Sequence, residues 1–382
     1  MAEDLAHQLR GLDLGKPDSK WEVNCKRFQH THPSKILSQT LPFFRQVEEV
    51  GVLTHFIDSG EFKLGSHEGL ATLKDDVSNF VKSGDRASIS NYLGHNMLEN
   101  YESFTPVTVD QLEDMGGLQK FIKQWTRKKD KSKLTIVCSR HNMIDLIMVP
   151  FSDQDVHLNA IHQNGYLYLF PDRKAGAEAQ GIHSKDSRIR KICYSGFELE
   201  SLVTDVKTRG LRSGFYSIVC GQIDPHLEIL FKAEMDALDS ETNTYTEIKC
   251  STGLKTRTSH HRRKLLRMWV QTSLIPSTSL LVGIKDPYYN QLTSFERYTR
   301  TQLYRKFNNT NLKFLALNYN YNANVSVQWF QHIMKAIQTL VEPHVPSETE
   351  GIQLPTSFKI TLTKDLVLML QKLDKMPPNT VF

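Results

Sequence analysis

The sequence lacks the patterns that mark a disulfide framework, a structural zinc site or a membrane-spanning helix. Its cysteines are odd in number, widely spaced and form no Cys-x-x-Cys pair, which argues against cross-linked or zinc-bound thiols and favours a reducing compartment. They are Cys25, Cys138, Cys193, Cys220 and Cys250. No apolar run approaches the ~20 residues that a membrane span needs, and the polar N-terminus has no apolar signal core. We therefore expect an intracellular protein with no membrane association.

The sequence also lacks the phosphate-binding loops GxxxxGK[ST] and GxGxxG, and no Ser-His-Asp arrangement can be argued from it. The net charge of +5 over 382 residues is modest, so the composition permits an anionic partner without requiring one. Hydrophobic residues make up 39% of the chain and charged residues 23%, proportions that are typical of globular proteins.

Hydrophobic periodicity predicts a mixture of helices and strands without regular βα alternation. We expect helices at 112–125, 194–206, 265–274 and 325–341, and a short helix from Asp365. Strands are expected at 50–53, 134–138, 145–150, 165–170, 226–233, 279–284 and 357–362. The mixture predicts an α/β (α+β) fold, with residues 36–382 forming a single domain around a mixed sheet. The polar residues 1–35 are expected to form a flexible arm.

The most informative part of the chain is the acidic triplet Glu234-Met235-Asp236, followed by Glu247-Ile248-Lys249. In a strand, residues i and i+2 project from the same face, and turn-forming residues separate the two triplets. Two adjacent strands would then present three carboxylates and one ammonium on one surface. Because converging carboxylates are difficult to keep ionised without a cation, the pattern predicts a divalent metal site that acts on a phosphodiester.

Carboxylate oxygens are the ligands that Mg²⁺ takes in proteins, with water and phosphate oxygens completing its coordination. Glu234, Asp236 and Glu247 supply such ligands, and Glu200 in the preceding helix is a fourth candidate. One or two Mg²⁺ or Mn²⁺ ions could activate water and clamp the attacking and leaving oxygens, while Lys249 could hold that water and offset transition-state charge. The simpler alternative is an exposed hairpin whose Glu and Lys pair across strands, worth about 0.2–1 kcal/mol.

Several further motifs occur in a fixed order around the two triplets. The spacing D-x10-E-x-K resembles the core of the PD-(D/E)XK nucleases. Gly196-Phe197-Glu198-Leu199-Glu200 precedes it, Arg140 lies further upstream, and Trp269-Val270-Gln271 lies downstream. Together these motifs resemble those of the DXO/RAI family of RNA 5′-end decapping exoribonucleases. Similar segments at 42–51, 100–104 and 282–287 extend the resemblance from about residue 40 into the 280s, with the core motifs at 134–287.

The resemblance implies a PD-(D/E)XK-like fold, in which helices flank a mixed, strongly bent β core. It implies a catalytic set of Glu234, Asp236, Glu247 and Lys249. The metal would be held by Glu200, Asp236, Glu247 and the backbone carbonyl of Ile248, and by Glu234 directly or through water. The substrate would be contacted by Glu102 and Arg140 at the 5′-terminal nucleotides, by Lys249 and Gln271 at the scissile phosphate, and by Glu234.

The resemblance also implies an activity, because family members hydrolyse incomplete or unmethylated caps, 5′-triphosphates or NAD caps, and digest RNA from 5′ to 3′. We therefore expect a metal-dependent hydrolase of RNA 5′ ends in the nucleus or cytoplasm, with a larger 5′–3′ exoribonuclease as a candidate partner. Two alternatives stay open: a DNA-acting PD-(D/E)XK nuclease, and a catalytically inactive RNA-binding scaffold of the same fold. The sequence leaves the preferred 5′ end and the oligomeric state undecided.

Overall fold

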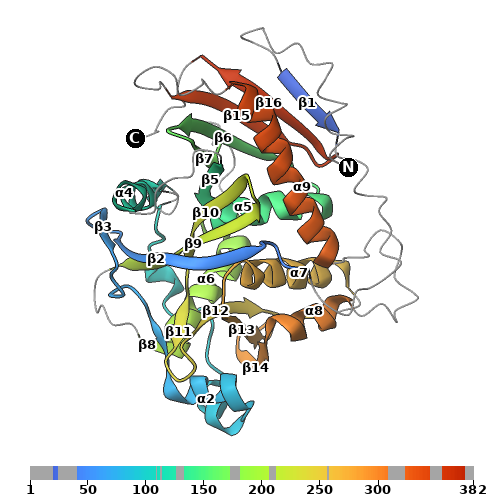
Figure 1. Ribbon diagram of the computed structural model, residues 1–382. Helices are drawn as coiled ribbons and strands as arrows, with labels where there is room; N and C mark the ends of the chain where they lie inside the picture. Colours follow the sequence, from blue (N-terminus) through green and yellow to red (C-terminus); the bar gives the residue numbers. More distant parts are fainter. Residues whose placement is uncertain are drawn as a thin grey trace.

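The computed structural model describes residues 20–24, 41–108, 110–111, 114–125, 133–172, 181–205, 212–255, 258–308, 323–344 and 355–374. In this part of the chain the strands form two mixed sheets with helices packed around them (Figure 1). The C-terminal strands lie at one end of the molecule and the short helix α2 (Asp75–Ser83) lies at the other.

The larger sheet has ten strands and joins distant parts of the chain. Its order is β1 (Lys20–Asn24), β16 (Val367–Leu373), β15 (Thr356–Leu362), β6 (Val156–Gln163), β7 (Tyr166–Pro171), β5 (Leu134–Ser139), β10 (Leu227–Glu234), β9 (Ser213–Asp224), β2 (Gln46–Phe56) and β3 (Glu61–Leu64). The sheet is mixed because β5 pairs in parallel with both β10 and β7, while every other pair of neighbouring strands in this sheet is antiparallel.

The smaller sheet has six strands and continues from the end of β10. Its order is β14 (Leu292–Tyr298), β13 (Thr278–Lys285), β12 (Thr244–Ser251), β11 (Ala237–Asp239), β4 (Thr72–Leu73) and β8 (Thr204–Asp205). β12 pairs in parallel with β13 and antiparallel with β11. The chain therefore passes from one sheet to the other between β10 and β11, within the acidic triplet.

Helices cover these sheets at several points. Besides α2 they are α4 (Gly116–Gln124), α5 (Arg140–Met148), α6 (Ser187–Val203), α7 (Ser259–Ser273), α8 (Arg300–Asn308) and α9 (Ala323–Val341). Short 3₁₀ turns occur at η2 (Ala87–Tyr92), η3 (Tyr101–Ser103), η4 (Val149–Phe151), η5 (Gly181–His183) and η7 (Glu342–His344). Among the described residues, no helix is both long and apolar enough to cross a lipid bilayer.

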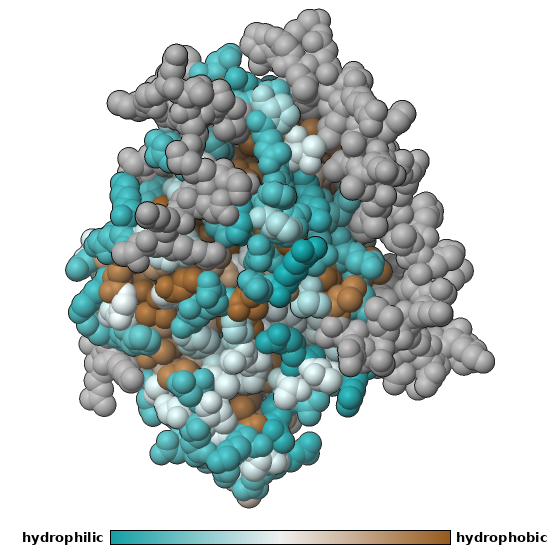
Figure 2. Space-filling model, in the orientation of Figure 1, coloured by the Kyte–Doolittle hydropathy of each residue, from teal (hydrophilic) through white to brown (hydrophobic). Residues whose placement is uncertain are grey.

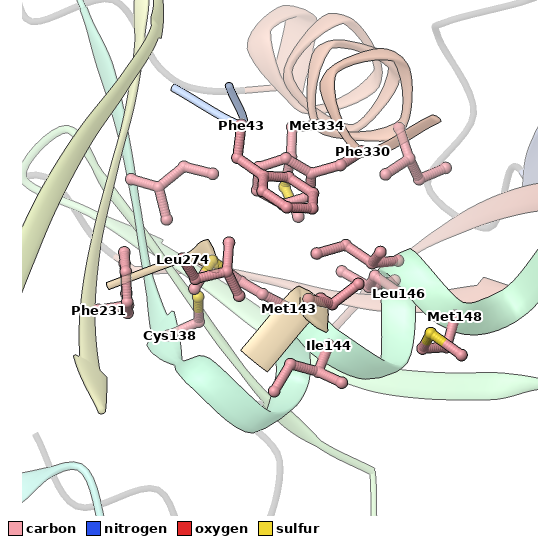
Figure 3. Packing of buried hydrophobic residues seen from close by; sticks show 14 of the residues in the cluster. Phe43, Cys138, Met143, Ile144, Leu146, Met148, Phe231, Leu274, Phe330 and Met334 are labelled. Carbon is pink, nitrogen blue, oxygen red and sulfur yellow. The ribbon is translucent and has the colours of Figure 1, made fainter. Parts of the chain in front are cut away.

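The largest hydrophobic cluster lies between the ten-stranded sheet and helices α5, α7 and α9. Figure 3 shows Phe43 and Phe330 on one side of this cluster and Phe231 of β10 and Met143 of α5 on the other. The rings of Phe43 and Phe330 meet edge to face, with centroids 5.5 Å apart. On the face drawn in Figure 2 hydrophilic residues predominate, with smaller hydrophobic areas between them. Burial of this cluster fixes α5 and α7, the helices that carry Arg140 and Gln271.

Most of the expected elements are present, with shifted ends. The predicted helices at 194–206, 265–274 and 325–341 correspond to α6, α7 and α9, and α6 begins seven residues earlier than expected, at Ser187. Six of the seven predicted strands are confirmed as parts of β2, β5, β7, β10, β13 and β15. The predicted helix at 112–125 is confirmed over α4, while residues 112–113 lie outside the described residues.

Two predicted elements are wrong. The segment 145–150, expected as a strand, lies in α5 and η4, where an apolar run is buried on nearly all sides and so carries no clear period. Helix α5 starts directly after Ser139, which caps its N-terminus: the Ser139 hydroxyl accepts a hydrogen bond from the Asn142 N–H at 3.4 Å. The helix expected from Asp365 is a tight turn followed by β16, with Leu366 at a φ of 59°. Pairing with β15 on one side and β1 on the other outweighs the local helical pattern.

The predicted arm at 1–35 is described only at Lys20–Asn24. These residues form β1, which pairs antiparallel with β16 at the edge of the large sheet. The remainder of the predicted arm lies outside the described residues. The division into an arm and a single domain at 36–382 stays a prediction.

Candidate active site

The acidic residues gather where the chain leaves the large sheet for the small one. β10 ends at Glu234, Met235 and Asp236 form the link, and β11 starts at Ala237. The acidic triplet therefore does not form one continuous strand, and this part of the prediction from the sequence is wrong. The expected hairpin forms one residue later, with Ala237 paired to Thr246. This register brings Asp236 to the start of the second triplet, where its Oδ2 accepts a hydrogen bond from the Ile248 N–H at 2.7 Å.

Lys249 ties the hairpin's two acids together. Its Nζ donates to Glu247 Oε1 at 2.6 Å, to Asp236 Oδ2 at 3.2 Å and to the Ile248 carbonyl at 3.0 Å. Glu247 and Lys249 are two residues apart on β12, so their side chains share a face of that strand. The structure thus brings three of the four predicted catalytic residues into direct contact.

Arg140 reaches the same cluster from the first turn of α5. β5 runs parallel to β10 with Ser139 opposite Lys232, so the residue after β5 lies beside the end of β10. The guanidinium donates to Glu247 Oε2 at 2.9 Å and to the Glu234 carbonyl at 2.7 Å. The Arg140 side chain is buried, and its position depends on a strand pairing that local sequence does not reveal.

Gln271, in the last turn of α7, contacts the other carboxylate oxygen of Glu247. Its side-chain amide donates to Glu247 Oε1. The helix is held by the buried ring of Trp269, which packs against Phe43 with centroids 5.6 Å apart. Glu247 is only 2% exposed and receives hydrogen bonds from arginine, lysine and glutamine together.

The charges in the cluster set its affinity for cations. Burial alone would raise the pKa of Glu247, but Arg140 and Lys249 outweigh that effect and lower it. Burial and the Glu247 charge raise the pKa of Asp236 to about 6. Burial and the negative charge of Asp236 raise the pKa of Glu200 well above its usual value. The pKa of Glu234 is also raised by the surrounding protein, although solvent reaches its side chain.

The carboxyl groups of Glu200 and Asp236 thus resist ionisation because of their burial and the negative charges of neighbouring acids. A divalent cation among them would relieve this repulsion, and oxygen donors of this type suit Mg²⁺ or Mn²⁺. Lys249, whose pKa is raised by Asp236 and Glu247 despite its burial, keeps one fixed positive charge beside them. The donor set therefore fits a hard divalent metal.

Glu102 was predicted to bind substrate, and among the described residues it forms no hydrogen bond or ion pair with the acidic cluster. It lies exposed on η3. The neighbouring residues of η3 border a cavity of about 580 Å³, lined by Asn100, Ser103, Phe104, Thr105, Tyr194 and Arg212. Tyr194 of α6 connects this cavity to the helix that carries Glu200.

The sequence reasoning missed the contacts that anchor α6. Tyr194 donates a hydrogen bond to Glu198 Oε2 at 2.9 Å, and His95 Nε2 lies 2.7 Å from Glu198 Oε1. The spacing of Tyr194 and Glu198, four residues apart on one helix, was the available signal. The His95 contact had no signal in the local sequence, because 103 residues separate it from Glu198.

A mixed sheet that bears an acid at a strand end, followed by an acid and a lysine at i and i+2 on the adjoining hairpin, defines the PD-(D/E)XK nuclease class. Comparison with known proteins identifies the family within this class. The chain belongs to the RAI1-like PD-(D/E)XK nuclease family, whose sequence model matches residues 59–380. Membership confirms the predicted fold class, the resemblance and the expectation of a hydrolase of the nuclease type.

The relatives cover most of the chain. Decapping and exoribonuclease protein 1 of Kluyveromyces lactis is 30% identical over 356 residues, which span 89% of this chain and 87% of that protein. The protein of the same name in Saccharomyces cerevisiae is 29% identical over 371 residues, spanning 92% and 83%.

Solved structures of related proteins have the same fold as this chain. K. lactis Dxo1 in complex with manganese matches 95% of this chain and 100% of its own, with a TM-score of 0.76 and 27% identity. S. pombe Rai1 matches 93% and 100%, with a TM-score of 0.67 and 16% identity, and supports the fold alone.

Proposed function

We propose that this protein is a divalent-metal-dependent hydrolase that removes caps from RNA 5′ ends and digests the strand from that end. The observation that carries the proposal is the cluster in which Asp236, Glu247 and Lys249 meet Arg140 and Gln271. It is supported by relatives that are named decapping and exoribonuclease proteins and cover most of the chain.

In this proposal the metal is held by Glu200, Asp236, Glu247 and the Ile248 carbonyl, with Glu234 binding directly or through water. The carbonyl already faces the Lys249 ammonium at 3.0 Å, so it points into the cluster. When bound, the cation would polarise the phosphorus centre and lower the pKa of a coordinated water. One or two Mg²⁺ or Mn²⁺ ions are expected.

The remaining side chains act on the substrate. The Lys249 ammonium holds the attacking water and compensates negative charge as water adds to phosphorus and the bond to the leaving oxygen breaks. Gln271 contacts the scissile phosphate from the side of α7. Arg140 orients Glu247 and, with Glu234, lines the approach of the 5′-terminal nucleotide, with Glu102 further out in the groove.

The substrate class is an RNA 5′ end bearing an incomplete or unmethylated cap, a triphosphate or an NAD cap. Structures of Rai1 proteins, which share only the fold with this chain, were solved with 3′-FADP and with pU5 and Mn²⁺. The first ligand belongs to the S. pombe protein and the second to the Candida albicans protein, and both are compatible with a site for nucleotide-like caps and RNA ends. We further propose action in the nucleus or cytoplasm, with a larger 5′–3′ exoribonuclease as a partner.

Product analysis tests the proposal. Purified protein with Mg²⁺ or Mn²⁺ is incubated with matched RNAs that carry 5′-monophosphate, triphosphate, unmethylated-cap, methylated-cap or NAD ends. We expect release of an intact cap, pyrophosphate or NAD, or of nucleotides stepwise from the 5′ end. Asp236→Ala should abolish every product, while Asp153→Ala, which removes a carboxylate that is 91% exposed, should not.

Each alternative has a distinct result in the same experiment. Internal cutting of DNA, without regard to 5′-end chemistry, would favour a DNA nuclease that uses the same acids. Tight RNA binding with no product from any end, in wild type and Asp236→Ala alike, would favour a scaffold. Full activity of Asp236→Ala would refute the metal assignment.

A further inference from the structure

α7 and β12 lie beside each other, and contacts at both ends define the line of polar groups between them. At one end, Gln271 of α7 donates to Glu247 of β12, inside the acidic cluster. At the other end, Lys264 Nζ of α7 donates to Ser251 Oγ at 3.0 Å and to the Cys250 carbonyl at 3.3 Å. We call Glu247, Lys249, Ser251, Lys264 and Gln271 the α7–β12 seam.

The periods of the two elements keep these side chains in one line. Glu247, Lys249 and Ser251 are at i, i+2 and i+4 of a strand and therefore share a face. Lys264 and Gln271 are two helical turns apart, which places them on the same side of α7 and separates them by about 10 Å along the axis. Lys264 is thus aligned with the cluster but too far from it to share the scissile phosphate.

Among the described residues, the ammonium of Lys264 is held only by neutral oxygens. An ammonium has three N–H donors, and two of them are used by Ser251 and the Cys250 carbonyl. Within the residues that the structure describes, no carboxylate lies within ion-pair distance of it, and the first turn of α7 contains no acid. Burial, together with the charges of Lys249 and Lys285, lowers the pKa of Lys264, although Cys250 acts in the opposite direction. Such a group favours an anion as its third partner.

The end of the seam is open to such an anion. Lys264 itself is only partly buried. The chain after Ser251 turns at Gly253, which has a φ of 145°, and a Cβ placed there would meet no atom within 4 Å. The Ser251 hydroxyl also bonds to Gly253, donating to its carbonyl at 3.0 Å, so it is fixed where it can orient the ammonium.

We propose that Lys264 binds a backbone phosphate of the RNA beyond the scissile bond, with Ser251 as the residue that positions its ammonium. The inference rests on the proposed function, which supplies the RNA strand, and it gives that strand a path along the α7–β12 seam. The group recognised is a phosphodiester, so the contact does not depend on base identity.

Binding by fluorescence anisotropy tests the proposal without requiring hydrolysis. Full-length protein carrying Asp236→Ala, with Mg²⁺, is titrated against 5′-monophosphorylated oligouridylate over a series of salt concentrations. Adding Lys264→Gln should weaken binding and reduce the slope of log K against log [salt] by about 0.7, the value for one phosphate contact in single strands. Lys264→Arg should restore the slope. Lys82→Gln is the control, since this exposed lysine on α2 pairs with Glu241, away from the seam.

A scan of neutral methylphosphonate linkages locates the contact. Each linkage of the oligouridylate is replaced in turn, and we expect one linkage, beyond the first, to weaken binding with Lys264 present and to have no effect in Lys264→Gln. Equal sensitivity of both proteins at every linkage, or an unchanged salt slope in Lys264→Gln, would overturn the proposal even if hydrolysis is observed. Conversely, a linkage-specific loss in the binding experiment, together with no product from wild-type protein in the product analysis, would support this subsite and refute the proposed hydrolysis.

Discussion

Arg140 and Glu247 form a buried ion pair, with the guanidinium Nη1 2.9 Å from Oε2 and side-chain exposures of 7% and 2%. The second nitrogen of the same guanidinium holds the Glu234 carbonyl at 2.7 Å, at the end of β10. One side chain thus links α5, the large sheet and the hairpin of the small sheet. The side chain therefore stabilises the charge of Glu247 and adds a contact between the two sheets.

Removing this link should cost stability as well as activity. Arg140→Ala leaves the Glu247 charge buried with Lys249 as the one cation that pairs with it among the described residues, and such a loss typically destabilises a protein by about 3–5 kcal/mol. Urea unfolding, followed by circular dichroism, measures the difference. Arg267→Ala is the matched control, because its pair with Asp145 is far more exposed at 42% and 34% and should contribute only about 0–1 kcal/mol. Equal losses in the two variants would show that Arg140 is not the central contact.

Neutralising Asp236 should stabilise the metal-free protein while removing its response to metal. At pH 7.5 Asp236 is ionised, although burial and the Glu247 charge raise its pKa to about 6 in the folded state. An unfolded aspartate titrates near 3.9, so holding the charge in the folded protein costs on the order of 3 kcal/mol. Asp236→Asn avoids this cost and keeps an oxygen for the Ile248 N–H.

Thermal unfolding with EDTA and with Mn²⁺ checks the Asp236→Asn prediction. We expect a higher midpoint than wild type in EDTA and little further increase on adding Mn²⁺, whereas the wild-type midpoint should rise. Asp153→Asn, on an exposed side chain, should behave as wild type in both conditions. A full Mn²⁺-induced increase in Asp236→Asn would place the metal elsewhere.

Metal affinity should increase with pH between about pH 5 and 7.5. The pKa of Asp236 is raised to about 6, and those of Glu200 and Glu234 are also raised, mainly by burial. Below these values the carboxyls hold protons that the cation must displace, and each displaced proton weakens binding by about tenfold per pH unit. Calorimetric titration with Mn²⁺ at several pH values measures the slope and the protons released. A flat profile would mean that these acids are ionised before the metal binds.

Much of the site could be predicted from the sequence because its centre is local. Glu247 and Lys249 share a strand face by the two-residue period, and the turn-forming residues after Asp236 predict the hairpin that returns β12 beside it. The order of the motifs then indicates the family. The sequence also predicts most helices and strands, because amphipathic or β-branched runs produce clear periods.

Secondary structure was predicted wrongly from the sequence in two situations. In one, near-complete burial removes the hydrophobic period, and in the other, pairing with a strand far away along the chain determines the conformation. The segment at 145–150 is buried nearly throughout, apart from Asp145, because it lies between a sheet and α9, so its helix could not be distinguished from a strand. The segment after Asp365 is a strand because β15 and β1 lie on both sides of it. In each case the deciding partner is far away along the chain.

The sequence by itself determined which groups are present and how the hairpin of Asp236, Glu247 and Lys249 is built, since short-range geometry is fixed by strand period and turn chemistry. Only the tertiary structure decided that Arg140, 107 residues before Glu247, and Gln271, 24 residues after it, would meet on that one carboxylate. Those contacts follow from the parallel pairing of β5 with β10 and from the burial of Trp269 beneath α7. Lys249 alone is local, and the other donors to this buried carboxylate are long-range because they lie on helices that only tertiary packing brings beside β12.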